Sequence, residues 1–270
     1  MTNQRLPTVW RIVTVFVLTC MVWWLSKAIR IWMGAGGEYD RTTHVLSAVL
    51  IFSLVLPLIV FARKYVDKRS WAGLRLTSFK EGWKPFVFGG LSYLIPAGIA
   101  LIIFVLFDWT EIQFHVSVSS LVLTIIALLI LVFMYEALPE ELIFRGYFYR
   151  NLNTSLAKWK AVGVQSLLFV LFAVSIGAAL SVERMVFFFA VGIIIGMVRV
   201  MTENVWGAVG LHVAFQTMQQ LFGPHNQELT STTPGLMEIV ILGIIPFSFA
   251  IMTLKLFVRK EPDWKEVDTE

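Results

Sequence analysis

The chain has 270 residues, of which 57% are hydrophobic and 15% are charged, and its mean hydropathy is +0.76. A soluble domain of this length cannot bury so much apolar surface, so the composition excludes an ordinary soluble protein and indicates a lipid solvent. The net charge of +4 comes from Lys and Arg residues that lie between apolar runs, which argues against nucleic acid as a partner. The single cysteine, Cys20, excludes an intrachain disulfide framework.

Eight apolar stretches are each about long enough to cross the hydrocarbon core, which takes roughly 20 helical residues. In chain order they cover residues 9–26, 44–62, 85–107, 117–138, 161–180, 185–201, 205–222 and 236–258. Trp23 and Trp24 stand where a signal peptide would have small residues, so we interpret the first stretch as a retained span. Because no linker or repeat divides the chain, we expect an all-α, multi-pass protein with one integral membrane domain over residues 1–270.

The basic residues set the expected sidedness, because short cytoplasmic loops are enriched in Lys and Arg. The second connection carries a basic set: Arg63, Lys64, Lys68, Arg69, Arg75, Lys80 and Lys84. The third connection carries Asp108 and Glu111 and has no Lys or Arg. Alternation from these two loops predicts a cell-membrane protein with both termini in the cytoplasm.

Ionisable residues within the spans collect at one membrane depth. Glu136, Glu140, Glu141 and Arg145 lie at the inner end of the fourth span. Each charged group placed in a bilayer costs about 2.5 to 3.5 kcal/mol on insertion scales, so such residues indicate a functional site. Glu141 and Arg145 are four residues apart and should pair on one helix face, whereas Glu140 is rotated by about 100° and stays free to point into a cavity.

Pro139 precedes this pair of glutamates directly. Proline is favoured in the first turn of a helix and disrupts a helix interior, so we expect the fourth span to kink or restart here. Both carboxylates would then lie near the positive end of a new helix dipole.

His212 and Gln216 are four residues apart, so they share one face of the seventh span. If that face meets Glu140, the carboxylate can take a proton from water, and the His and Gln side chains can hydrogen-bond the oxyanion that forms on a peptide carbonyl. The alternative is structural: Glu141 and Arg145 form an interhelical staple, and His212 binds a neighbouring helix. Spacing alone leaves both interpretations open.

These residues resemble three motifs of the CPBP intramembrane proteases, a family named for CAAX proteases and bacteriocin-processing enzymes. Glu140 begins an EExxxR motif, Phe169 stands where an FxxxH motif begins, and His212 stands where an HxxxN motif begins. The resemblance covers residues 121–220, which we take as the catalytic core.

In that family the core helices enclose a cavity open to the cytoplasmic side, and the first Glu of the first motif activates water. The resemblance therefore implies that role for Glu140, with Glu141 and Arg145 as its support and His212 as the group that positions water or binds the oxyanion. It also implies a peptide or protein substrate near the cytoplasmic leaflet of the lipid bilayer, with prenylated CAAX tails as the substrates of eukaryotic members.

Two positions depart from the family pattern. Ala173 stands where the second motif has its histidine, and Gln216 stands where the third motif usually has Asn. The chain is thus a degenerate non-cutting member, an active variant in which another group fills the gap, or an engineered inactive form. Our leading interpretation is an endopeptidase that Ala173 weakens, and the runner-up is an inactive immunity or accessory factor of the same fold. A transporter is disfavoured because the polar residues form no relay across the membrane.

A metal site is a separate hypothesis. Glu140, Glu141 and His212 could supply three ligands, which is the number that catalytic zinc sites usually take from the protein. Ala173 leaves this set with a single histidine, which is poor for zinc. On the glutamic-type interpretation no cofactor is required.

Overall fold

The computed structural model describes residues 6–34, 40–223 and 228–268, and most of them are helical. The α-helices are α1 (Thr8–Trp32), α2 (Arg41–Phe61), α3 (Phe79–Leu106), α4 (Val118–Val132), α5 (Leu138–Glu141), α6 (Tyr149–Asn153), α7 (Lys158–Ile176), α8 (Val182–Thr202), α9 (Val205–Leu221), α10 (Pro234–Leu236) and α11 (Ile245–Leu254). Wider π-helical segments are Ala62–Val66, Phe133–Ala137, Leu142–Phe148 and Met237–Ile244, and Trp71–Leu74 is a 3₁₀ turn. Strands β1 (Ile112–Phe114) and β2 (Leu229–Ser231) form a short antiparallel pair, with Gln113 opposite Thr230.

Within the described ranges, seven helical stretches are long and apolar enough to cross a membrane. They are Thr8–Trp32, Arg41–Val66, Trp71–Leu106, Val118–Asn153, Lys158–Ile176, Val182–Thr202 and Pro234–Leu254. The prediction of an all-α, multi-pass membrane protein is therefore confirmed. The stretch expected as an eighth span is α9, whose 17 residues reach only about 25 Å. Most of α9 is buried inside the bundle, so neighbouring helices rather than lipid cover it.

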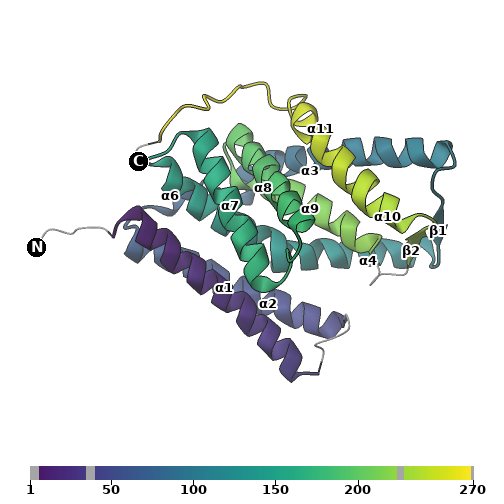
Figure 1. The fold of residues 1–270 in the computed structure, drawn as a ribbon, viewed down its shortest axis with the longest axis horizontal. Coiled ribbons are helices and arrows are strands. Elements are labelled where there is room, and N and C mark those ends of the chain that lie inside the picture. The colour runs from purple at the N-terminus through teal and green to yellow at the C-terminus, as the bar shows by residue number, and fades with distance from the viewer. Residues whose placement is uncertain (1–5, 35–39, 224–227, 269–270) are drawn as a thin grey trace, which may run out of the picture.

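The helices form a bundle around α9, which packs against α3, α4 and α8. Helices α1 and α2 lie together along one flank, with α7 beside α1 (Figure 1). The first and last described residues lie at one end of the bundle, and the β1–β2 pair lies at the other (Figure 1). This placement agrees with two termini on the same side of the membrane. The terminal residues themselves lie outside the described ranges, and the side that faces the cytoplasm stays a prediction.

Helices α3 and α9 approach so closely that only glycine fits at the crossing. A Cβ atom on Gly89 would collide with the carbonyl oxygen of Gly207, and one on Gly210 would collide with the carbonyl oxygen of Phe86. Small residues that let two backbones meet are a general means of packing helices within a membrane. This crossing fixes the position of α9, and therefore of His212, against the rest of the bundle.

Replacing Gly89 with Ala is expected to lower the thermal unfolding midpoint in detergent sharply. The added methyl would push α3 away from α9, and overpacking of this kind costs about 1 to 3 kcal/mol or more where the clash is with backbone. Gly98→Ala is the matched control, because it lies on the same helix and its Cβ would meet nothing within 4 Å. Equal midpoints for the two variants would contradict the close crossing.

A buried carboxylate joins the α1–α2 pair to the core. Asp67 is fully buried at the end of α2 and accepts hydrogen bonds from Arg11, Arg63, Tyr147 Oη at 2.9 Å and Asn151 at 3.1 Å. A buried charge is tolerated when it is paired and hydrogen-bonded in this way. Because Tyr147 and Asn151 lie on the helix that also carries Glu140, the network holds that helix against α1 and α2.

The C-terminal segment, residues 259–268, returns across the end of the bundle where the chain begins (Figure 1). Its backbone is tied to the α6–α7 turn: Lys158 and Trp159 donate their N–H groups to Glu266 and Trp264, and Asp268 donates to Asn153. Ion pairs join Asp268 to Arg150 and Glu266 to Lys158. The segment therefore covers the turn between α6 and α7, where the glutamate-bearing helix ends.

Lowering the pH below about 4 is expected to loosen the C-terminal segment. The Arg150 guanidinium holds the pKa of Asp268 below its ordinary value of 3.8, and Lys260 likewise lowers the pKa of Glu203. A lowered folded-state pKa contributes stability above the ordinary value, and this stability is lost as pH falls through the folded-state pKa. Hydrogen exchange of residues 261–268, corrected for intrinsic rates, measures the change. Asp268→Asn should remove most of the pH response, and unchanged protection of the parent at pH 3 would contradict the expectation.

Candidate active site

The glutamates lie on one long helix that does not break. The stretch from Val118 to Asn153 is helical throughout, and Ala137, just before Pro139, keeps helical angles of φ −64° and ψ −54°. The expected restart at Pro139 is therefore wrong, because the helix continues through this point, and a kink there stays a prediction. The π-helical segment Phe133–Ala137 accommodates the proline, because its wider turns absorb the missing N–H and the ring. The expected placement of the carboxylates at a free helix N-terminus is wrong for the same reason.

Glu141 and Arg145 form the ion pair that their spacing predicts. Arg145 Nη1 lies 3.0 Å from Glu141 Oε1, and both side chains are fully buried. The guanidinium also donates to the carbonyl oxygen of Gly192 on α8 at 3.3 Å and lies over the ring of Phe169, 4.7 Å from its centroid. Arg145 therefore connects the glutamate-bearing helix to α7 and α8.

His212 bonds directly to Glu141. Its Nδ1 lies 2.8 Å from Glu141 Oε1, the same oxygen that Arg145 binds. Helical spacing favoured Glu140 as the group that meets the face of His212, so the direct hydrogen-bond partner differs from that expectation. Because the carboxylate accepts, Nδ1 carries the proton and Nε2 is left for another group.

Glu140 is the carboxylate that remains free. Its side chain makes no hydrogen bond within the described part of the chain and keeps 8% of its surface exposed, whereas Glu141 is at 0%. It interacts electrostatically with His212, Glu136, Glu141 and Arg145. The helix thus carries one neutralised glutamate and one unpartnered glutamate side by side, as the spacing predicts.

Helix α9 runs antiparallel to the glutamate-bearing helix and contacts it at two levels. His212 meets Glu141 at one level, and Gln220 Nε2 lies 3.4 Å from Glu136 Oε1 at the other. Gln216 lies between them on the same face of α9, which brings it level with Glu140. It is half-buried and has no hydrogen bond to any other described residue, so its amide is available. Gln220 was not among the predicted site residues, although its eight-residue spacing from His212 places it on the same face.

Ala173 lies on α7 at the depth of the two glutamates. Phe169, one turn earlier, covers Arg145, while Ile176, one turn later, lines a cavity together with Tyr135. Position 173 falls between these two contacts and is fully buried. Alanine places no polar atom at this position.

The arrangement of these side chains gives the metal hypothesis no support, and the use of a metal stays a prediction. In the part of the chain that the structure describes, no three His, Cys, Asp or Glu residues are grouped so that they could hold a metal ion. Glu140, Glu141 and His212 therefore do not form the three-ligand set considered above.

Comparison with known proteins agrees with the motifs. Residues 121–218 match the family model described as Type II CAAX prenyl endopeptidase Rce1-like, and this stretch contains Glu140, Glu141 and His212. No curated protein and no solved structure matches the chain. The predicted resemblance to the CPBP proteases is confirmed at the level of the family. Residues 121–218 are thus similar to the Rce1-like type II CAAX prenyl endopeptidases.

Proposed function

We propose that the chain is an intramembrane endopeptidase in which Glu140 activates water to hydrolyse a peptide bond. The observation that carries the proposal is the free carboxylate of Glu140 beside a histidine that another carboxylate already orients. A general base must be unpaired and close to the groups that stabilise the developing charge. Glu140 fits this requirement, whereas Glu141 is occupied by Arg145 and His212.

The reaction balances with the side chains present. Glu140 takes a proton from water, and the resulting hydroxide forms a bond to the carbonyl carbon of the substrate. In its protonated form, His212 donates through Nδ1 to Glu141 and through Nε2 to the oxyanion, and the Gln216 amide is a second donor. Glu140 then passes its proton to the amide nitrogen as the carbon–nitrogen bond breaks, which yields a carboxylate and an amine. No metal and no cofactor is needed for these steps.

Glu141 and Arg145 position the imidazole ring of His212. Their ion pair fixes the orientation of the imidazole, in the way that a buried carboxylate orients a catalytic histidine in other hydrolases. The substrate that we propose is a peptide or protein segment held near the cytoplasmic leaflet. The family match supports this class and leaves the sequence of the substrate open.

Peptide cleavage by the full chain in lipid vesicles tests the function. The assay offers prenylated and unmodified C-terminal peptides in ¹⁸O-labelled water and identifies the products by mass spectrometry. We expect cleavage at one peptide bond, with ¹⁸O in the new carboxyl group because water attacks directly. Absence of any cleavage, both by the parent and by the Ala173→His variant, would contradict the proposal.

Replacing Ala173 with His is expected to raise the cleavage rate by about tenfold or more. A histidine at this depth would add a polar group beside Glu140, and single groups of this kind commonly change kcat by 10²- to 10³-fold. The matched control is Ala173→Phe, which adds a ring without a hydrogen-bonding group.

The alanine at position 173 supports a second candidate function, that of a non-cutting accessory or immunity protein with this fold. Cleavage by Ala173→His together with a silent parent would favour that candidate. Equal rates for the parent and Ala173→His would instead show that the chain cuts without this histidine.

A further inference from the structure

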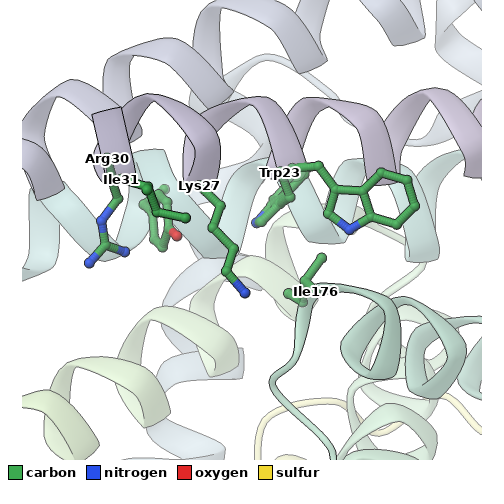
Figure 2. Close-up of a pocket in the computed structure, with 7 residues that line it drawn as sticks. Trp23, Lys27, Arg30, Ile31 and Ile176 are labelled. Atoms are coloured by element: carbon green, nitrogen blue, oxygen red, sulfur yellow. The ribbon is translucent and has the colours of Figure 1, made fainter. Parts of the chain in front are cut away.

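A cavity of about 200 Å³ lies between α1 and the end of α7 (Figure 2). Its lining includes Trp23, Trp24, Lys27, Arg30, Tyr135 and Ile176. Figure 2 shows Lys27 and Arg30 projecting from α1 on the side that faces Ile176. The lining contains no residue of α9 and none of the proposed catalytic groups.

The cavity is positively charged. Lys27 and Arg30 are three residues apart, so they share one face of α1. Lys27 has no hydrogen bond or ion pair with any residue that the structure describes, and Arg30 bonds to the phenol of Tyr135. Among the described residues, no Asp or Glu lines the cavity, and Asp40, which precedes α2, interacts electrostatically with Arg30 from outside it. The two cations therefore favour an anionic ligand.

The depth of the two cations matches the headgroup region of a bilayer. Arg30 is in the last turn of α1, and the helix ends at Trp32, which is 86% exposed. Lys27 lies about 4.5 Å deeper along the helix. The ends of a spanning helix lie at the level of the lipid phosphates, where Trp residues also concentrate. Trp24 is 49% exposed beside the cavity, so the opening faces lipid.

The walls of the cavity are fixed by specific contacts. Trp24 Nε1 donates to the carbonyl oxygen of Ser175 at 2.9 Å, and Trp23 packs edge-on against Phe172 with ring centroids 5.0 Å apart. Gly177 ends α7 with φ +85°, which favours glycine, and it lies beside Lys27, because a Cβ there would be 3.8 Å from Lys27 Nζ. These contacts hold α1 and α7 at a set separation and keep the space from collapsing.

We propose that this cavity binds the phosphate of an anionic phospholipid, with Lys27 and Arg30 as its ligands. The guanidinium and the ammonium contact the phosphate, while Trp24 and Ile31 lie against the glycerol and the first acyl carbons. Basic pockets between membrane helices bind anionic headgroups by the same chemistry. The site is independent of proteolysis, and it lies at the end of the bundle away from the C-terminal segment.

Native mass spectrometry and thermal unfolding of the full chain in neutral detergent test the proposal. The ligands are phosphatidylglycerol, phosphatidylcholine with the same acyl chains, and inorganic phosphate. We expect phosphatidylglycerol to bind and raise the unfolding midpoint, phosphatidylcholine to bind at least about tenfold more weakly, and inorganic phosphate to have no effect. The Lys27→Gln/Arg30→Gln variant should lose phosphatidylglycerol affinity by about 30-fold. Each of the two cations accounts for about half of this loss in binding free energy.

Arg184→Gln is the matched control, because Arg184 is an exposed cation at the start of α8, at the same end of the bundle and outside the cavity. It should keep the affinity of the parent. Lys27→Arg/Arg30→Lys retains both charges and should also bind, which separates loss of ligand contacts from loss of fold. Equal binding of the two lipids, an equal loss in Arg184→Gln, or an equal response to inorganic phosphate would overturn the proposal. So would displacement of the lipid by a peptide with a free C-terminal carboxylate, since the cavity would then belong to the substrate.

Discussion

Glu140→Gln is expected to lower kcat for peptide cleavage by about 10³-fold or more while leaving the unfolding midpoint near that of the parent. The amide keeps the size of the side chain and cannot take a proton from water, so only the general-base step is lost. Glu140 has no hydrogen bond to lose within the described chain, which is why the fold should tolerate the change. Cleavage kinetics in vesicles and thermal unfolding measure the two effects.

Glu136→Gln is the matched control for that variant. Glu136 is one turn away on the same helix and meets Gln220 rather than His212. We expect it to change kcat by less than about tenfold, because a hydrogen bond to Gln220 survives the substitution. Equal rates for the parent and Glu140→Gln would remove Glu140 from the mechanism, and equal losses in the two variants would show that the effect is not specific to the proposed base.

Arg145→Met is expected to destabilise the fold by about 3 to 5 kcal/mol. The substitution leaves Glu141 charged and buried with only His212 to compensate, and an uncompensated buried charge costs this much. It also removes the contacts with the carbonyl of Gly192 and the ring of Phe169. Chemical or thermal unfolding in detergent measures the loss.

A double variant separates the charge from the packing. In Glu141→Gln/Arg145→Met no unpaired charge remains, so part of the stability should return. Lys158→Met is the surface control: its ion pair with Glu266 is partly exposed, and such pairs contribute about 0 to 1 kcal/mol. If Arg145→Met proved no more damaging than Lys158→Met, the buried pair would not be the support that we describe.

Much of the site follows from periodicity. The pairing of Glu141 with Arg145, the free side chain of Glu140 and the shared face of His212 and Gln216 all depend on helical spacing, which a sequence displays directly. The apolar stretches likewise predicted the membrane helices, because length and hydropathy are local properties of the sequence.

The partner of His212 could not be obtained in this way. Which of two adjacent carboxylates meets α9 depends on the rotation of the glutamate-bearing helix, and the π-helical segments on both sides of Glu141 change that rotation. The same segments explain why Pro139 does not break the helix. Asp67 and the cavity beside Lys27 were also missed, since both depend on how α1 and α2 pack against residues far away in the sequence.

The π-helical segment Phe133–Ala137 makes the direction of Glu140 and Glu141 depend on where in the helix a residue is lost. A wide turn holds one residue more than an ordinary helical turn, so the loss of one residue here would restore a regular α-helix with almost the same reach across the bilayer and the same direction beyond it. The loss of one residue from α4 would instead rotate everything after it by about 100°, which would carry Glu140 and Glu141 away from α9. A single-codon deletion in α4 could thus separate insertion into the membrane from chemistry, because the span would survive while its two carboxylates faced another neighbour.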